Sequence, residues 1–147
     1  MKELKGTKIA IQGLGNVGGN AATIFSHRGA VIVAVSDVSG GVYKEDGLNT
    51  EEITSFIKSG KLLKDYNAEG VCHITNKEVL TGSCDVLVPA ALENQINEDI
   101  ASKVQCSFIV EAANGPTTKE TDEVLKERGI VLVPDIFANS GGVIILF

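Results

Sequence analysis

The stretch Thr7-Lys8-Ile9-Ala10-Ile11-Gln12-Gly13-Leu14-Gly15-Asn16-Val17-Gly18-Gly19 decides the fold of this 147-residue chain. Its apolar part, 9–11, has the composition of a short buried strand, and residues 20–25 have the composition of a helix. Gly13, Gly15 and Gly18 form the pattern G-x-G-x-x-G between the strand and the helix, which is the context in which this motif predicts dinucleotide binding.

Each of the three glycines has a separate physical role. Gly13 permits a tight turn at the end of the strand, Gly15 lets a pyrophosphate approach the backbone, and Gly18 lets the helix pack closely on the strand. The first N–H groups of the helix and its dipole attract the phosphates. A glycine-rich turn without a ligand is the alternative interpretation of the motif alone.

The residues that follow support the dinucleotide interpretation. Gly29 ends the predicted helix, 31–35 has the composition of a second buried strand, and Asp37 lies at its end, 19 residues after Gly18. An acidic residue at this place accepts hydrogen bonds from the adenosine ribose. Asp37 also repels a 2′-phosphate, and no Arg or Lys follows before Lys44. The sequence therefore favours NAD as cofactor, with NADP possible.

Strands alternate with helices along the chain. This predicts an α/β fold in a single domain, 1–147, with a Rossmann-like, doubly wound, mostly parallel sheet and helices on both faces. We expect Thr50 to be an N-cap, and Val17, Ala21, Ile24 and Phe25 to form the apolar face of the first helix. Strands are expected at 8–12, 31–36, 71–75, 84–89, 107–111 and 130–133. Helices are expected at 16–28, 50–60, 76–80, 97–104 and 117–128. A small hairpin is expected within 39–47, and irregular chain at 61–69.

Small and polar residues follow several of these strands, at the glycine turn, at Asp37, and at 89–91, 112–114 and 139–142. The carboxyl ends of the strands form the ligand crevice of an open α/β sheet. Any one cluster is explained by a turn, but their recurrence favours one long ligand lying across this edge.

The composition excludes several other classes of function. The net charge of −6 argues against a nucleic-acid partner. No secretory signal and no membrane-spanning apolar run is visible, so we expect a cytoplasmic protein that does not bind membranes. Cys72, Cys84 and Cys106 are expected to be free thiols. His27 and His73 are isolated in the sequence, so no metal site is expected.

Taken together, these motifs resemble the cofactor-binding domain of the glutamate/leucine/phenylalanine/valine dehydrogenase family, over nearly the whole chain. Within the family, 39–46 and 93–96 are more similar to glutamate dehydrogenases than to leucine dehydrogenases. The resemblance rests on the segments 11–18, 34–43, 89–96, 111–118 and 134–143.

The resemblance implies oxidative deamination of an L-amino acid, most closely glutamate to 2-oxoglutarate and ammonia, with hydride transfer to NAD(P). It also implies a hexamer. It assigns the pyrophosphate to 13–18, with Asn16 and Val17 touching the cofactor, and the adenosine ribose to Asp37. Ala90 and Ala91 would line the adenosine side, Asn114 and Asn139 would lie near the nicotinamide, and Val143 would approach the substrate side chain.

The catalytic lysine and aspartate of the family belong to a preceding substrate domain, so no catalytic residue is predicted in this chain. Leu146 stands where the family usually places a substrate-binding serine, and the sequence is consistent with a truncated C-terminus. We therefore expect the isolated chain to bind a dinucleotide without turnover, and amino-acid or 2-oxo-acid substrate only together with the missing domain. Two alternatives remain open: a non-catalytic module that pairs with a separate chain, and a fragment of a leucine- or phenylalanine-type dehydrogenase.

Overall fold

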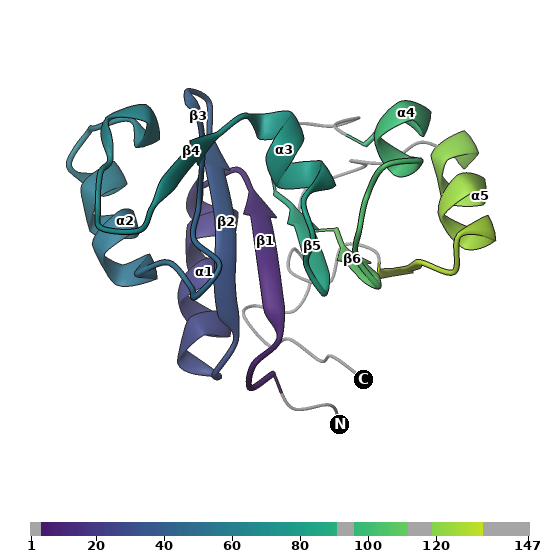
Figure 1. The fold of residues 1–147 in the computed structure, drawn as a ribbon, viewed down its shortest axis with the longest axis horizontal. Helices are drawn as coiled ribbons and strands as arrows, with labels where there is room; N and C mark the ends of the chain where they lie inside the picture. The colour runs from purple at the N-terminus through teal and green to yellow at the C-terminus, as the bar shows by residue number, and fades with distance from the viewer. Residues whose placement is uncertain (1–3, 91–95, 112–118, 134–147) are drawn as a thin grey trace.

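The computed structural model describes residues 4–90, 96–111 and 119–133. These residues build one seven-stranded sheet in the order β4-β3-β2-β1-β5-β6-β7 (Figure 1). The strands β2, β1, β5, β6 and β7 run parallel, and β3 is antiparallel to both of its neighbours, β2 and β4, which confirms a mostly parallel α/β sheet. The strands are β1 (Lys8–Gln12), β2 (Val31–Asp37), β3 (Gly40–Tyr43), β4 (Cys72–Ile74), β5 (Val86–Pro89), β6 (Phe108–Val110) and β7 (Val131–Val133).

The helices cover both faces of the sheet. Along β1, Ile9 and Ile11 belong to one buried cluster and Ala10 to the other, because successive side chains of a strand point to opposite faces. The first cluster includes side chains from α1 (Asn16–His27) and α2 (Thr50–Lys58), and the second includes side chains from α3 (Asn76–Thr81), α4 (Glu98–Ala101) and α5 (Lys119–Glu127).

Local details of three helices differ from the sequence-based expectation. Asn49, and not Thr50, caps α2, since the Asn49 side chain accepts a hydrogen bond from the Glu52 N–H at 3.0 Å. Val17 is 42% exposed, because the buried stripe of α1 begins one residue later, at Gly18, and continues through Ala21, Ala22 and Phe25. Helix α4 ends at Ala101, although the expected helix extends to 104.

The segment 61–69, expected to be irregular, contains a 3-10 turn, η1 (Leu63–Asp65), that is anchored in the core. Leu63 is fully buried and Tyr66 is 3% exposed. The Tyr66 hydroxyl donates a hydrogen bond of 2.8 Å to the Glu52 carboxylate. The rings of Tyr66 and Phe56 pack edge to face, with their centroids 5.3 Å apart. Tyr66 therefore joins the segment to α2.

Burial, together with the hydrogen bond to Glu52 and its negative charge, raises the pKa of Tyr66 from 10.0 to about 12. Because the pKa of Tyr66 is higher in the folded chain than in the unfolded chain, its protonated hydroxyl stabilises the fold at pH values below the unfolded pKa. This stability is lost as the pH rises from about 10 to about 12. We expect urea unfolding at about pH 11 to show a loss of about 1 kcal/mol, relative to about pH 9, that is absent in Tyr66→Phe. Tyr43→Phe is the control variant. An equal loss in wild type and Tyr66→Phe would contradict the assignment.

Candidate functional site

The glycine turn between β1 and α1 is held by the neighbouring strand. Gly13 has a φ of 97°, a conformation that favours glycine. The Gly13 N–H donates to two oxygens of Ser36, the carbonyl oxygen at 3.0 Å and the hydroxyl oxygen at 3.2 Å from the Gly13 nitrogen. Ser36 is fully buried at the end of β2. This role of Ser36 is not predicted from the sequence, in which a lone serine inside an apolar strand is the only signal for it.

At Gly18, α1 packs directly against the turn. A Cβ added at Gly18 would lie 1.8 Å from the Gly13 carbonyl oxygen and 3.3 Å from the Ala90 Cβ. Ala90 follows β5, and its N–H donates to the Gln12 carbonyl at 2.7 Å. The structure therefore brings Gly13, Gly18 and Ala90 together at the carboxyl edge of the sheet, as the sequence predicts for a ligand crevice.

Gly15 faces open space in this crevice. No heavy atom lies within 4 Å of a Cβ added there, and its φ of −71° and ψ of −164° are accessible to any residue. Asn16 and Val17 are exposed beside it, and the first turn of α1 contains no acidic side chain. Free N–H groups in this turn suit a phosphate. The geometry thus fits a dinucleotide whose pyrophosphate passes over Gly15.

Asp37 lies at the same edge, at the end of β2, and its carboxylate is held by the protein. One oxygen accepts from the Ser39 N–H at 2.7 Å and the Ser39 hydroxyl at 2.5 Å, and the other accepts from the Leu63 N–H at 2.8 Å. The Asp37 carbonyl oxygen also accepts from the Asn76 amide at 3.1 Å. Asp37 therefore joins the β2–β3 turn to η1 and α3, a role that the motif does not predict.

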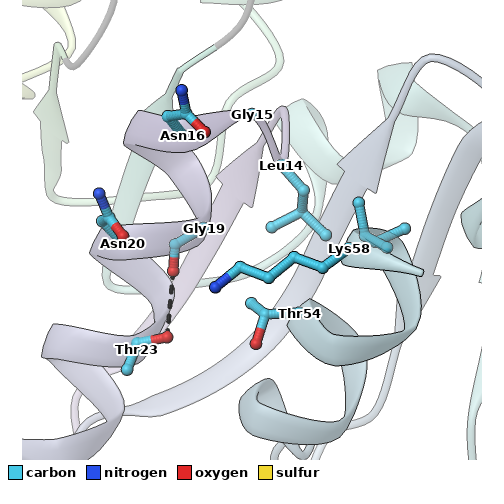
Figure 2. Close-up of a pocket in the computed structure, with 9 residues that line it drawn as sticks. Leu14, Gly15, Asn16, Gly19, Asn20, Thr23, Thr54 and Lys58 are labelled. Atoms are coloured by element: carbon cyan, nitrogen blue, oxygen red, sulfur yellow. Dashed lines mark hydrogen bonds between the residues drawn. The ribbon is translucent and has the colours of Figure 1, made fainter. Parts of the chain in front are cut away.

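A pocket of about 240 Å³ lies beside the glycine turn, between α1 and α2. Figure 2 shows the Lys58 side chain extending from α2 toward α1, with its ammonium group facing Gly19 and Thr23. This places a positive charge near the first turns of α1. Lys58 is not predicted as a site residue from the sequence. The available signal is the spacing of four residues between Thr54 and Lys58, which puts both on one face of α2. Leu14, Gly15, Asn16, Gly19, Asn20, Thr23, Thr54, Ile57 and Lys58 line the pocket.

Some predicted site residues, namely Ala91, Asn114, Asn139 and Val143, lie outside the residues that the structure describes. Within the described ranges, no group of three or more His, Cys, Asp or Glu side chains could hold a metal ion. No helix in these ranges is both long enough and apolar enough to cross a membrane.

Two curated relatives match nearly the whole chain. NADP-specific glutamate dehydrogenase from Saccharolobus shibatae is 46% identical over 141 residues, which are 96% of this chain and 33% of the relative. NADP-specific glutamate dehydrogenase A1 from Halobacterium salinarum is 46% identical over 147 residues, 99% of this chain and 35% of the relative. The chain thus spans about one third of the length of these relatives.

Solved glutamate dehydrogenases share the fold. Glutamate dehydrogenase 2 from Plasmodium falciparum superposes with a TM-score of 0.84 at 30% identity, over 95% of this chain and 32% of that one. The hetero-hexameric glutamate dehydrogenase from Thermus thermophilus, in its Leu-bound form, gives a TM-score of 0.81 at 32% identity, over 95% of this chain and 32% of that one. The model of the Glutamate/Leucine/Phenylalanine/Valine dehydrogenase family matches residues 1–146, so this chain belongs to that family.

Proposed function

We propose that this chain is the dinucleotide-binding domain of an amino-acid dehydrogenase, most closely a glutamate dehydrogenase. The observation that carries the proposal is the open backbone at Gly15, next to the closely packed Gly18 and at the same sheet edge as Asp37 and Ala90. A cofactor of this kind accepts hydride from the carbon that bears the substrate amine. The names of the relatives support the choice of substrate.

The chain's own residues bind and orient the cofactor in this proposal. The pyrophosphate lies over 13–18, with Asn16 and Val17 beside it, and Ala90 and Ala91 line the adenosine side. Asn114 and Asn139 hold the nicotinamide end, because two amides can bond its carboxamide and fix which ring face meets the substrate. Val143 approaches the substrate side chain. The acid and base groups belong to the part of the relatives that this chain does not span.

Titration of the chain with NADH tests the proposal. The fluorescence of the reduced nicotinamide is followed during the titration. We expect saturable binding that unlabelled NAD displaces. A chain that is folded by circular dichroism and gives no saturable signal with NADH or NADPH would overturn the proposal.

The sequence-based preference for NAD over NADP rests on Asp37. Its negative charge favours NAD, whereas two relatives at 46% identity are named NADP-specific. Because three protein donors already hold the carboxylate, we propose that Asp37 mainly fixes the turn and that the chain accepts both cofactors. The acceptance of NADP does not then require the loss of Asp37.

Replacing Asp37 by alanine separates these two roles. We expect Asp37→Ala to lower the free energy of unfolding by about 1–3 kcal/mol, since the Leu63 N–H and both Ser39 donors lose their acceptor. Affinities for NADH and NADPH are expected to fall together, with their ratio changing less than about threefold, that is, by less than about 0.7 kcal/mol. Glu45→Ala, at an exposed acidic residue, is the control. A selective gain in NADPH affinity would show that Asp37 discriminates by charge.

Two further parts of the proposal concern the whole protein. A cytoplasmic location follows from the sequence-based expectation. A hexameric assembly follows from the family resemblance, and the Thermus thermophilus protein is described as a hetero-hexamer. Neither property enters the cofactor tests above.

A further inference from the structure

Cys84 and Cys106 occupy corresponding positions on neighbouring chain segments. Ser83 forms a parallel bridge with Gln105, and farther along the same two segments Val86 pairs with Phe108. Both pairs have the same offset in sequence, and this register puts Cys84 opposite Cys106. The Cys84 N–H also donates to the Gln105 carbonyl at 3.2 Å. The two cysteines therefore lie opposite each other, next to the starts of β5 and β6 and away from the carboxyl edge that carries the glycine turn.

Both cysteine side chains point to the same face of the sheet. Cys84 belongs to the buried cluster beneath α3, α4 and α5, and Cys106 packs against that cluster. Neighbouring strands lie about 4.8 Å apart, within the range of about 4.4–6.8 Å between the Cα atoms of a disulfide. A disulfide is therefore compatible with the spacing of the two segments.

The surroundings make the two thiols unequal. Cys84 is 8% exposed, whereas Cys106 is only partly buried. The neighbouring Cys84 thiol and the positive charge of Arg128 lower the pKa of Cys106. The neighbouring Cys106 and burial raise the pKa of Cys84. Arg128 is held nearby, since its guanidinium donates to the Ala101 carbonyl at 2.5 Å. Cys106 is thus the better thiolate and Cys84 the better S–H donor.

We propose that Cys84 and Cys106 form a peroxide-reactive dithiol site, in which Cys106 is oxidised first and Cys84 closes an intramolecular disulfide. The Cys106 thiolate attacks hydrogen peroxide, the O–O bond breaks, and the products are a sulfenic acid and, after protonation, water. The Cys84 sulfur then attacks the Cys106 sulfur, the S–O bond breaks, and a second water leaves. Two thiols and one peroxide give one disulfide and two waters. The site is independent of the proposed cofactor function.

Peptide mapping of the oxidised wild-type chain tests the proposal directly. Lys103 lies between the two cysteines, so trypsin separates Cys84, in peptide 78–103, from Cys106, in peptide 104–119. After treatment of the folded, reduced chain with one equivalent of hydrogen peroxide, we expect these two peptides to remain joined until a reductant is added. The mass of the joined product should be lower by two hydrogen atoms than the sum of the two reduced peptides. Non-reducing electrophoresis should show that the linked product is a monomer.

Trapping with dimedone tests the order of the two steps. In Cys84→Ser the sulfenic acid should persist on Cys106, with an adduct yield at least about tenfold above that at Cys84 in Cys106→Ser. Cys72→Ser is the matched control, because Cys72 is exposed on the edge strand β4 and should leave the disulfide unchanged. Peroxide that modifies only Cys72, links different chains or reacts first at Cys84 would overturn the proposal. Even where a serine variant fails to fold, the wild-type map distinguishes the intramolecular disulfide from modification of Cys72 or links between chains, and dimedone present during the oxidation of wild type shows which cysteine is oxidised first.

Discussion

Replacing Gly15 by valine is expected to weaken NADH binding at least about 100-fold, or about 2.7 kcal/mol, while the chain still folds. The backbone at Gly15 already has a conformation that valine can adopt, and an added Cβ meets no protein atom within 4 Å. The added side chain would therefore begin in the space that we assign to the pyrophosphate. Titration with NADH and urea unfolding of the same preparation measure the two effects separately.

The stability of Gly15→Val should change only slightly. Gly15 is the N-cap of α1, and valine is a poorer N-cap than glycine, so we expect a loss of no more than about 1 kcal/mol. Ser55→Val adds an isopropyl group at an exposed position of α2 and serves as the binding control. Unchanged NADH affinity in Gly15→Val would mean that the turn does not hold the cofactor, and it would remove the main support of the proposed function.

Replacing Gly18 by alanine is expected to damage the fold itself. Its Cβ would lie 1.8 Å from the Gly13 carbonyl oxygen and 2.9 Å from the Gly13 carbonyl carbon. These are backbone atoms, and the Gly13 N–H is fixed by Ser36, so the turn cannot move away without losing its hydrogen bonds. We expect a loss of at least about 3 kcal/mol, a large share of the roughly 5–15 kcal/mol that stabilises a typical domain.

The adjacent glycine provides the control for Gly18→Ala. At Gly19 an added Cβ would approach only the Thr54 methyl carbon, at 3.9 Å. Gly19→Ala should therefore be neutral or stabilising by up to about 1 kcal/mol, since alanine favours a helix over glycine. Urea or thermal unfolding of both variants measures the difference. Equal stabilities of Gly18→Ala and Gly19→Ala would contradict the close contact between α1 and the turn.

The motif predicts the roles of Gly13 and Gly18 because both are local. The turn needs a residue with positive φ at Gly13, and the crossing of α1 over β1 needs a missing side chain at Gly18. The alternation of strands and helices predicts the mostly parallel sheet for the same reason, since each element is encoded by a few neighbouring residues. The hydrogen bonds of Asp37 cannot be predicted in this way, because one of them comes from the backbone N–H of Leu63, 26 residues later in the chain.

By itself, the sequence determined the strand–turn–helix unit, the α/β class and the glycine that leaves room for a ligand. Tertiary structure alone decided that Asp37 holds η1, that Lys58 extends toward α1 and that Cys84 lies opposite Cys106. Short-range patterns are readable because propensity and periodicity act over one or two turns of chain. A contact between distant segments depends on strand order and register, and backbone N–H donors, which every residue except proline carries, leave no mark in the sequence.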